Sequence, residues 1–205
     1  MIKFDSCAFV DPDTITSLEK YPIDDRSKRW DGKAKAVIRF KNEIMTQGLT
    51  IQNKKCAWCT LSIAAEGRRT AHRDHIAPKA RHPKWTFNPN NLIIACEYCN
   101  GFAVKGGIDT IHKLNDAYEE CIFLIVHPYL DEPSDHLEFT YCNTRELPVL
   151  IKGKTPKGIW TIENLQLDST GLTTERAKDI VWEKQLSELP PNAQALLKAA
   201  TASLG

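Results

Sequence analysis

Apolar positions between residues 31 and 48 recur at the spacing of one helical face. Asp31 stands before this stripe and Gly48 after it, as helix-starting and helix-ending residues do. The pattern therefore predicts a helix over residues 31–48. The apolar members of its stripe are Ala34, Val37, Ile38, Ile44 and Met45.

The second half of the chain predicts short strands followed by helices. An apolar run at Ile122–Val126 and alternating stretches at Leu137–Tyr141 and Ile159–Leu165 indicate strands. A helix is expected from Thr173 through Leu186, ending before two prolines, and an Ala/Leu-rich helix closes the chain. Residues 52–105 are rich in Cys, Asn and Pro, a composition typical of loops and short strands. Together with the predicted helices, the pattern indicates an α+β fold.

Composition sets broad limits on the class of protein. The chain has 205 residues, of which 42% are hydrophobic and 26% charged, as in ordinary globular proteins. No apolar run approaches the roughly 18 residues that cross a bilayer, so no membrane association is expected. The first residues do not have the pattern of a secretory signal, and we expect a cytoplasmic protein.

The net charge of +1 hides an uneven distribution. Residues 52–105 hold nine Lys or Arg against three acids, whereas residues 106–150 hold two against nine. The first segment can meet phosphate groups, and the second cannot.

Two Cys-x-x-Cys pairs indicate a metal site. Cys56 with Cys59 and Cys96 with Cys99 have the spacing that lets four thiolates reach one tetrahedral zinc ion. The alternatives are a redox dithiol, which needs only one pair, or unrelated buried cysteines. Structural zinc is the favoured interpretation, since cytosolic thiols are kept reduced.

A further motif lies between and after these pairs. It consists of Asp74-His75-Ile76 with Pro78, then Asn91-Leu92, and then Asn100 directly after the second pair. In this order, inside two zinc knuckles, the residues resemble the HNH endonucleases of the ββα-metal type. The close match covers residues 54–105, about a quarter of the chain. The resemblance implies an HNH nuclease core at residues 52–106, between an N-terminal helical region at 1–51 and a mixed α/β extension at 107–205.

The resemblance also implies roles for individual residues. His75 is expected to be the general base, and Asp74 and Asn100 to bind one catalytic Mg²⁺ or Mn²⁺ ion. Asn91 is expected to hold the loop and orient the base. Hydrolysis of a phosphodiester needs such a base and such a cation. Six basic residues are expected to contact nucleic acid, with DNA favoured over RNA: Arg69, Arg73, Lys79, Arg81, Lys84 and Lys105.

One geometric condition follows from the order of these residues. Neighbours on a regular strand point to opposite faces, so Asp74 and His75 can serve one site only if the strand twists or ends there. His72 shares the face of Asp74 and is the rival for the metal site or the role of base.

The extension carries a weaker resemblance. Residues 127–137, 161–165 and 172–176 are similar to the extension of HNH proteins that accompany an SMC-like or ABC-type ATPase in bacterial anti-phage defence, including the Septu and retron-associated kinds. This similarity implies a partner ATPase; the alternative is a packing extension. For the whole protein, the alternative to a nuclease is a zinc-ribbon nucleic-acid-binding or adaptor module without catalysis.

Overall fold

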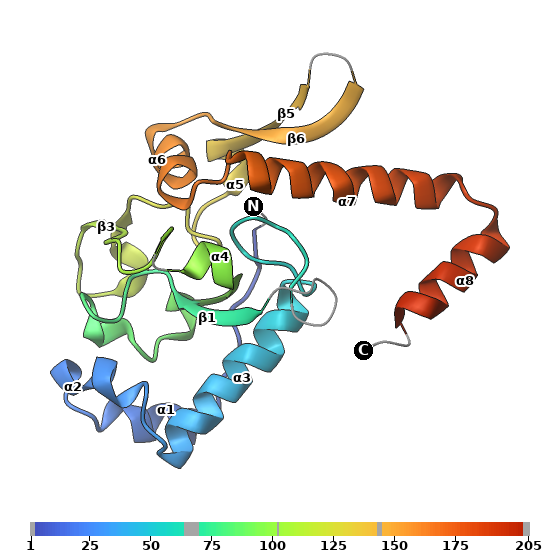
Figure 1. Cartoon of the computed structure of the whole chain (residues 1–205). Coiled ribbons are helices and arrows are strands. Elements are labelled where there is room, and N and C mark those ends of the chain that lie inside the picture. Colours follow the sequence, from blue (N-terminus) through green and yellow to red (C-terminus); the bar gives the residue numbers. More distant parts are fainter. Residues whose placement is uncertain (1–2, 64–69, 102, 143–144, 203–205) are drawn as a thin grey trace.

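The computed structural model describes residues 3–63, 70–101, 103–142 and 145–202, and has a mixed α+β fold (Figure 1). The described strands form small two-stranded antiparallel sheets, β1 with β2, β3 with β4 and β5 with β6. The predicted α+β class is confirmed at this level. The helices are α1 (Pro12–Glu19), α2 (Ile23–Arg29), α3 (Lys35–Ile51), α4 (Glu97–Asn100), α5 (Pro133–His136), α6 (Pro156–Leu165), α7 (Thr170–Glu188) and α8 (Pro191–Ala202). The strands are β1 (Ala71–His75), β2 (Leu92–Cys96), β3 (Ile111–Lys113), β4 (Ile122–Phe123), β5 (Leu137–Cys142) and β6 (Arg145–Gly153).

The predicted helix near residues 31–48 is α3, and both of its ends differ from the prediction. It begins at Lys35 with Ala34 rather than Asp31 at its N-cap, so the predicted stripe member Ala34 precedes the helix. Ile38, another member of that stripe, is exposed. Val37, Phe40 and Ile44 form its buried face, at the spacing expected of a helix. The helix runs past Gly48, which is buried against β2, to Ile51. A Cβ atom at Gly48 would lie 2.7 Å from Cγ1 of Ile94. Gly48 is therefore explained by close packing rather than by helix termination.

The strand β2 lies in the core and pairs with β1, which is buried at its end, at Asp74 and His75. The antiparallel register runs from Ala71 opposite Cys96 to His75 opposite Leu92. All five residues of β2 are buried, because α3 packs against this strand. The short helix α4 follows β2 directly, which gives the local order strand, strand, helix.

One predicted strand is wrong. Residues 159–165 belong to α6, which begins where the Thr155 hydroxyl accepts a hydrogen bond from the Gly158 amide. Thr161, Ile162 and Leu165 are buried at helical spacing. Over so few residues the apolar positions also fit the alternation of a strand, which explains the wrong prediction. The strand expected at Ile122–Val126 is reduced to the two residues of β4. The strand expected at Leu137–Tyr141 is confirmed as β5, and the two final helices are confirmed as α7 and α8.

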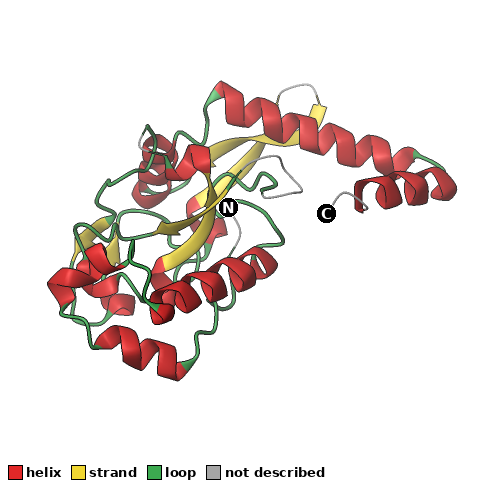
Figure 2. Ribbon diagram, turned by 60° about the horizontal axis from the view of Figure 1, so that its bottom comes forward, coloured by secondary structure: helices red, strands yellow, loops and turns green. Residues whose placement is uncertain are grey.

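One hydrophobic cluster connects most of the chain, from Phe4 to Leu172. The helices α7 and α8 extend away from this body (Figures 1 and 2). Within α7 only Leu172 and Arg176 are buried, both near its start. Across the described residues, no helix combines the length and the apolar character needed to cross a membrane.

Candidate functional site

The two Cys-x-x-Cys pairs meet at one point of the fold. Cys56 and Cys59 follow α3, Cys96 ends β2, and Cys99 lies in α4. All four side chains are buried, and their sulfur atoms lie within 4.8 Å of one another. These residues could therefore hold a metal ion such as zinc.

The spacing of the sulfur atoms fits tetrahedral coordination. A Zn–S bond of about 2.3 Å places sulfur ligands about 3.8 Å apart, and Cys59 Sγ lies 3.9 Å from Cys96 Sγ. A disulfide would need about 2.05 Å. The amide of Cys96 also donates a hydrogen bond to Cys56 Sγ at 3.3 Å. The arrangement would suit a closed site with four protein ligands.

A cavity of about 470 Å³ opens beside β1 and α4. Asp74 and His75 both line it although they are neighbours in the sequence. They can do so because β1 ends at His75, which is the strand end that the sequence required. The polar and aromatic residues of its lining are Trp30, His72, Arg73, Asp74, His75, Lys79, Glu97 and Asn100.

The Asp74 carboxylate is buried and paired on both oxygens. Lys105 Nζ donates to Oδ1 at 2.8 Å, and Trp58 Nε1 donates to Oδ2 at 2.7 Å. Lys105 also donates to the His75 carbonyl oxygen and is only 1% exposed. Lys105 was predicted to contact phosphate at the surface. In the structure it is buried and pairs with the Asp74 carboxylate instead.

Removing the Lys105 charge should destabilise the fold. In Lys105→Met the Asp74 charge stays buried without its partner, which typically costs about 3–5 kcal/mol of unfolding free energy. Urea unfolding of the zinc-loaded protein measures this cost, and Lys152→Met on the exposed face of β6 is the matched control. The double variant Asp74→Asn/Lys105→Met, which removes both charges, should lose less than Lys105→Met alone. A loss below about 1 kcal/mol in Lys105→Met would contradict a tightly paired buried carboxylate.

The His75 imidazole has a defined orientation and tautomer. Its Nε2 lies 3.0 Å from the Thr86 carbonyl oxygen. Because a carbonyl only accepts, Nε2 carries the proton and Nδ1 of the neutral ring keeps a lone pair. The Trp30 ring packs against the imidazole at 71° with centroids 4.4 Å apart. Burial lowers the pKa of His75 to about 3, assisted by the charges of Lys105 and Lys79, so the ring is neutral at pH 7.

Asn91 holds the loop between β1 and β2. Its Oδ1 accepts from the Ala77 amide at 2.7 Å, and its Nδ2 donates to the carbonyl oxygens of Ala77 and Trp85, each at 3.0 Å. Asn91 is fully buried and does not line the cavity. It therefore connects the start of the loop to the residue just before Thr86.

Asn100 reaches the cavity because the cysteine site positions it. It directly follows Cys99, ends α4 and is half-buried. The side-chain oxygens of Asn100 and Asp74 are donors of the kind that Mg²⁺ prefers. Each Asp74 oxygen accepts one of the two hydrogen bonds described above and keeps another lone pair, so an ion bound there would share Asp74 with Lys105.

His72 is exposed and differently bonded. Its Nε2 lies 2.9 Å from Thr70 Oγ1, and that hydroxyl donates to Glu97 Oε2 at 2.9 Å. His72 lines the same cavity as Asp74, as strand alternation predicts. It lacks the buried, carbonyl-bound orientation of His75.

The other predicted phosphate contacts are partly or fully exposed: Arg73, Lys79, Arg81 and Lys84. Arg73 and Lys79 line the cavity, and Lys79 Nζ lies 3.6 Å from an Asp31 carboxylate oxygen. Arg69 lies outside the described residues.

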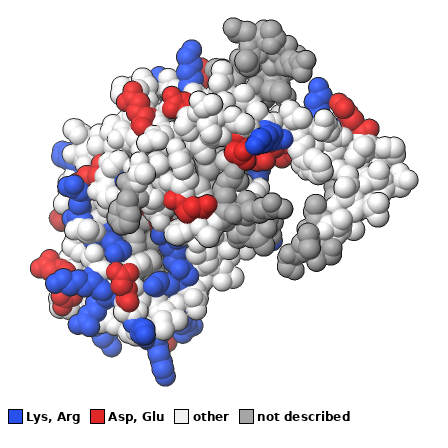
Figure 3. All heavy atoms as spheres, in the orientation of Figure 1, with Lys and Arg blue, Asp and Glu red and all other residues white. Residues whose placement is uncertain are grey.

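The cavity also contains a residue that the sequence did not single out. Trp30 reaches it from the connection between α2 and α3, and no motif marks this tryptophan. Exposed basic residues flank it in the sequence, and Figure 3 shows Lys and Arg gathered with some acids over the part of the molecule where α2 and the start of α3 lie. These flanking residues are Lys28, Arg29, Lys33, Lys35 and Arg39.

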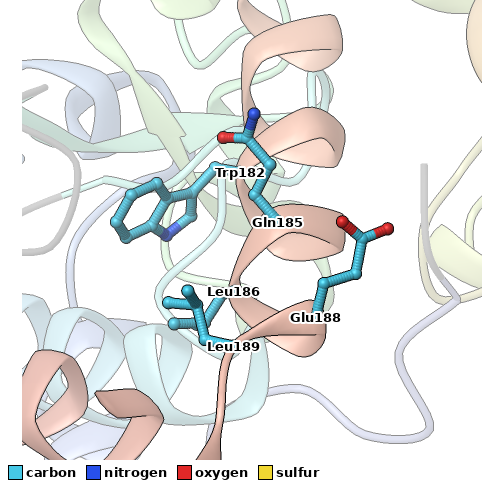
Figure 4. Close-up of a pocket in the computed structure, with 5 residues that line it drawn as sticks. All are labelled: Trp182, Gln185, Leu186, Glu188 and Leu189. Atoms are coloured by element: carbon cyan, nitrogen blue, oxygen red, sulfur yellow. The ribbon is translucent and has the colours of Figure 1, made fainter.

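A second hollow, of about 370 Å³, lies on α7 near its end (Figure 4). Trp182, Leu186 and Leu189 form its apolar part, with Gln185 and Glu188 beside them. Glu188 is the one titratable side chain among these lining residues, so the hollow offers no acid–base pair.

Comparison of the chain with models of protein families and with curated proteins finds no match. The interpretation of the site therefore depends on its geometry and on the motif.

Proposed function

We propose that this protein is a metal-dependent HNH-type endonuclease that hydrolyses phosphodiester bonds of nucleic acid. The observation that carries the proposal is the state of His75. It is a neutral imidazole with Nε2–H bound to Thr86 and a lone pair on Nδ1, in the wall of a cavity shared with Asp74 and Asn100. A general base needs such a lone pair, held in a fixed direction.

The local architecture supports the same proposal. The strands β1 and β2 and the helix α4 follow one another in the strand–strand–helix order of the resemblance. Cys56 and Cys59 precede this unit, Cys96 ends β2 and Cys99 lies in α4, and we infer that the four cysteines hold one structural zinc ion. Such an ion would fix α4, and with it Asn100, relative to β1.

In the proposed reaction His75 takes the proton of the attacking water. A pKa of about 3 in the free protein would make the imidazole a weak acceptor, but the negative charge of a bound phosphate favours the imidazolium and raises this pKa. Asp74 and Asn100 would hold a Mg²⁺ or Mn²⁺ ion, which supplies positive charge to the phosphate and the leaving oxygen. Arg73 and Lys79 attract the nucleic-acid backbone to the cavity.

The proposal extends to substrate and partner. Exposed basic residues lie on the connection from α2 to α3, near Trp30 in the sequence, and contacts from such residues position a backbone without reading bases. DNA is the expected substrate. The similarity of residues 127–137, 161–165 and 172–176 to defence-associated HNH proteins makes an SMC-like or ABC-type ATPase the expected partner, with anti-phage defence as the biological role.

A cleavage assay tests the proposal. The zinc-loaded protein is incubated with supercoiled plasmid, single-stranded DNA and RNA, with Mg²⁺, with Mn²⁺ and without either ion. Omitting the ions instead of adding a chelator leaves the cysteine site intact. Cleavage that depends on Mg²⁺ or Mn²⁺, with plasmid DNA preferred, is the expected result. Binding of nucleic acid with no cleavage under any condition would replace the nuclease by the adaptor alternative.

A further inference from the structure

A chain of buried hydrogen bonds runs from His127 to the loop that orients His75. His127 Nε2 lies 2.9 Å from Tyr118 Oη, and Tyr118 Oη lies 2.9 Å from Asn91 Oδ1. His127, Tyr118 and Asn91 are at most 1% exposed. The first two residues belong to the segment after residue 106, outside the motif that points to a nuclease.

The direction of every proton in this chain is determined. The amides of Tyr129 and Leu130 donate to His127 Nδ1 at 3.2 and 3.3 Å, so Nδ1 carries no proton. The neutral ring must then carry its proton on Nε2 and donate it to Tyr118 Oη. The Tyr118 hydroxyl in turn donates to Asn91 Oδ1. Burial lowers the pKa of His127 to about 3, which keeps this direction at neutral pH.

The chain ends on the backbone that holds His75. Asn91 Nδ2 binds the carbonyl oxygens of Ala77 and Trp85 and so ties together two distant points of the loop. Trp85 is followed by Thr86, whose carbonyl oxygen accepts from His75 Nε2. This loop contains only short 3-10 turns, whose backbone hydrogen bonds join residues close in the chain. The side chain of Asn91 adds the contacts to Ala77 and Trp85, which those turns do not connect.

We propose that Tyr118 and His127 are positioning residues for His75, acting through Asn91 and the Thr86 carbonyl. The inference rests on the proposed function for its catalytic meaning. Loss of the Tyr118 hydroxyl leaves His127 Nε2–H buried without an acceptor, and a buried unpaired donor is costly enough to shift its surroundings. A shift of the Thr86 carbonyl changes the direction of the His75 lone pair, and small displacements of a reacting group can reduce a rate about 100-fold.

Steady-state kinetics of four variants test the catalytic part. Tyr118→Phe should lower kcat about 10- to 100-fold with KM unchanged, because the substrate-binding surface is intact. His127→Leu should behave alike, whereas His127→Gln, whose amide can still donate to Tyr118, should restore most of kcat. Tyr129→Phe is the matched control, since its hydroxyl donates at 2.8 Å to the Leu92 carbonyl oxygen and not to Asn91. Equal kcat losses in Tyr118→Phe and Tyr129→Phe would overturn the proposal.

A second measurement does not depend on cleavage. Nitrogen NMR of ¹⁵N-histidine-labelled protein at pH 7.5 should show His75 and His127 as Nε2–H tautomers in the parent. In Tyr118→Phe and His127→Leu the His75 signals should broaden or shift toward mixed tautomers, and in Tyr129→Phe they should stay as in the parent. Unchanged His75 signals in the first two variants overturn the positioning role. If the parent cleaves nothing but the His75 signals change as expected in Tyr118→Phe and His127→Leu, the positioning role stands and the nuclease proposal fails.

Discussion

The His75→Ala protein should bind nucleic acid as the parent does and cleave it about 10²- to 10⁴-fold more slowly. The substitution removes the proton acceptor and leaves the cysteine site and the Asp74–Lys105 pair in place. Single-turnover cleavage with saturating protein measures the chemical step, and a filter-binding titration measures affinity.

His72→Ala is the matched control for this prediction. Its imidazole lines the same cavity but is exposed and hydrogen-bonded to Thr70. It should keep most of the activity. If His72→Ala abolished cleavage while His75→Ala remained active, His72 would be the base. Full activity in both variants would contradict a histidine base.

Cys99→Ser should lose the zinc ion and the folded state together. We expect about one zinc ion per chain in the parent, and the free energy of binding at such sites, about 10–16 kcal/mol in small peptides, is coupled to folding. The serine oxygen does not replace a thiolate, and Asn100 would lose its support as well. Zinc analysis by mass spectrometry and circular dichroism measure both effects.

Cys7→Ser serves as the control for the zinc site. Cys7 is a half-buried thiol outside the cluster, so zinc content and fold should be retained. A folded, unoxidised parent with less than half a zinc ion per chain would contradict the structural zinc site. A Cys99→Ser protein that keeps the parent's circular dichroism spectrum would show that the fold does not need the ion.

Several features followed from local sequence because they depend on local physics. The helix α3 was predictable from periodicity, although neither Asp31 nor Gly48 marks its ends. The long helix α7 was predictable from its opening Thr residues and from the prolines after it. The meeting of Cys56, Cys59, Cys96 and Cys99 was predictable because two short turns with this spacing suit one tetrahedral ion. The sequence also indicated that the strand must twist or end near His75 if Asp74 and His75 are to line one site, and β1 ends there.

Other features depended on contacts between distant residues. The α6 helix was mistaken for a strand because a short apolar window fits both periods, and packing of Thr161 and Ile162 decides between them. Gly48 reads as a helix end from sequence alone, and only the approach of Ile94 explains it.

By itself, the sequence determined which residues can supply chemistry and how those close in the chain are spaced, because ligand type and turn geometry are local properties. Only the tertiary structure decided that Lys105 pairs with Asp74 instead of facing solvent, that Trp30 packs on His75, and that Tyr118 reaches Asn91. These pairings join residues that are far apart in the sequence, by 27 positions for Tyr118 with Asn91 and 31 for Lys105 with Asp74. The polar pairings are selected by the cost of burying an unpaired polar group. That cost depends on which segments share the core, and no single segment of the sequence specifies it.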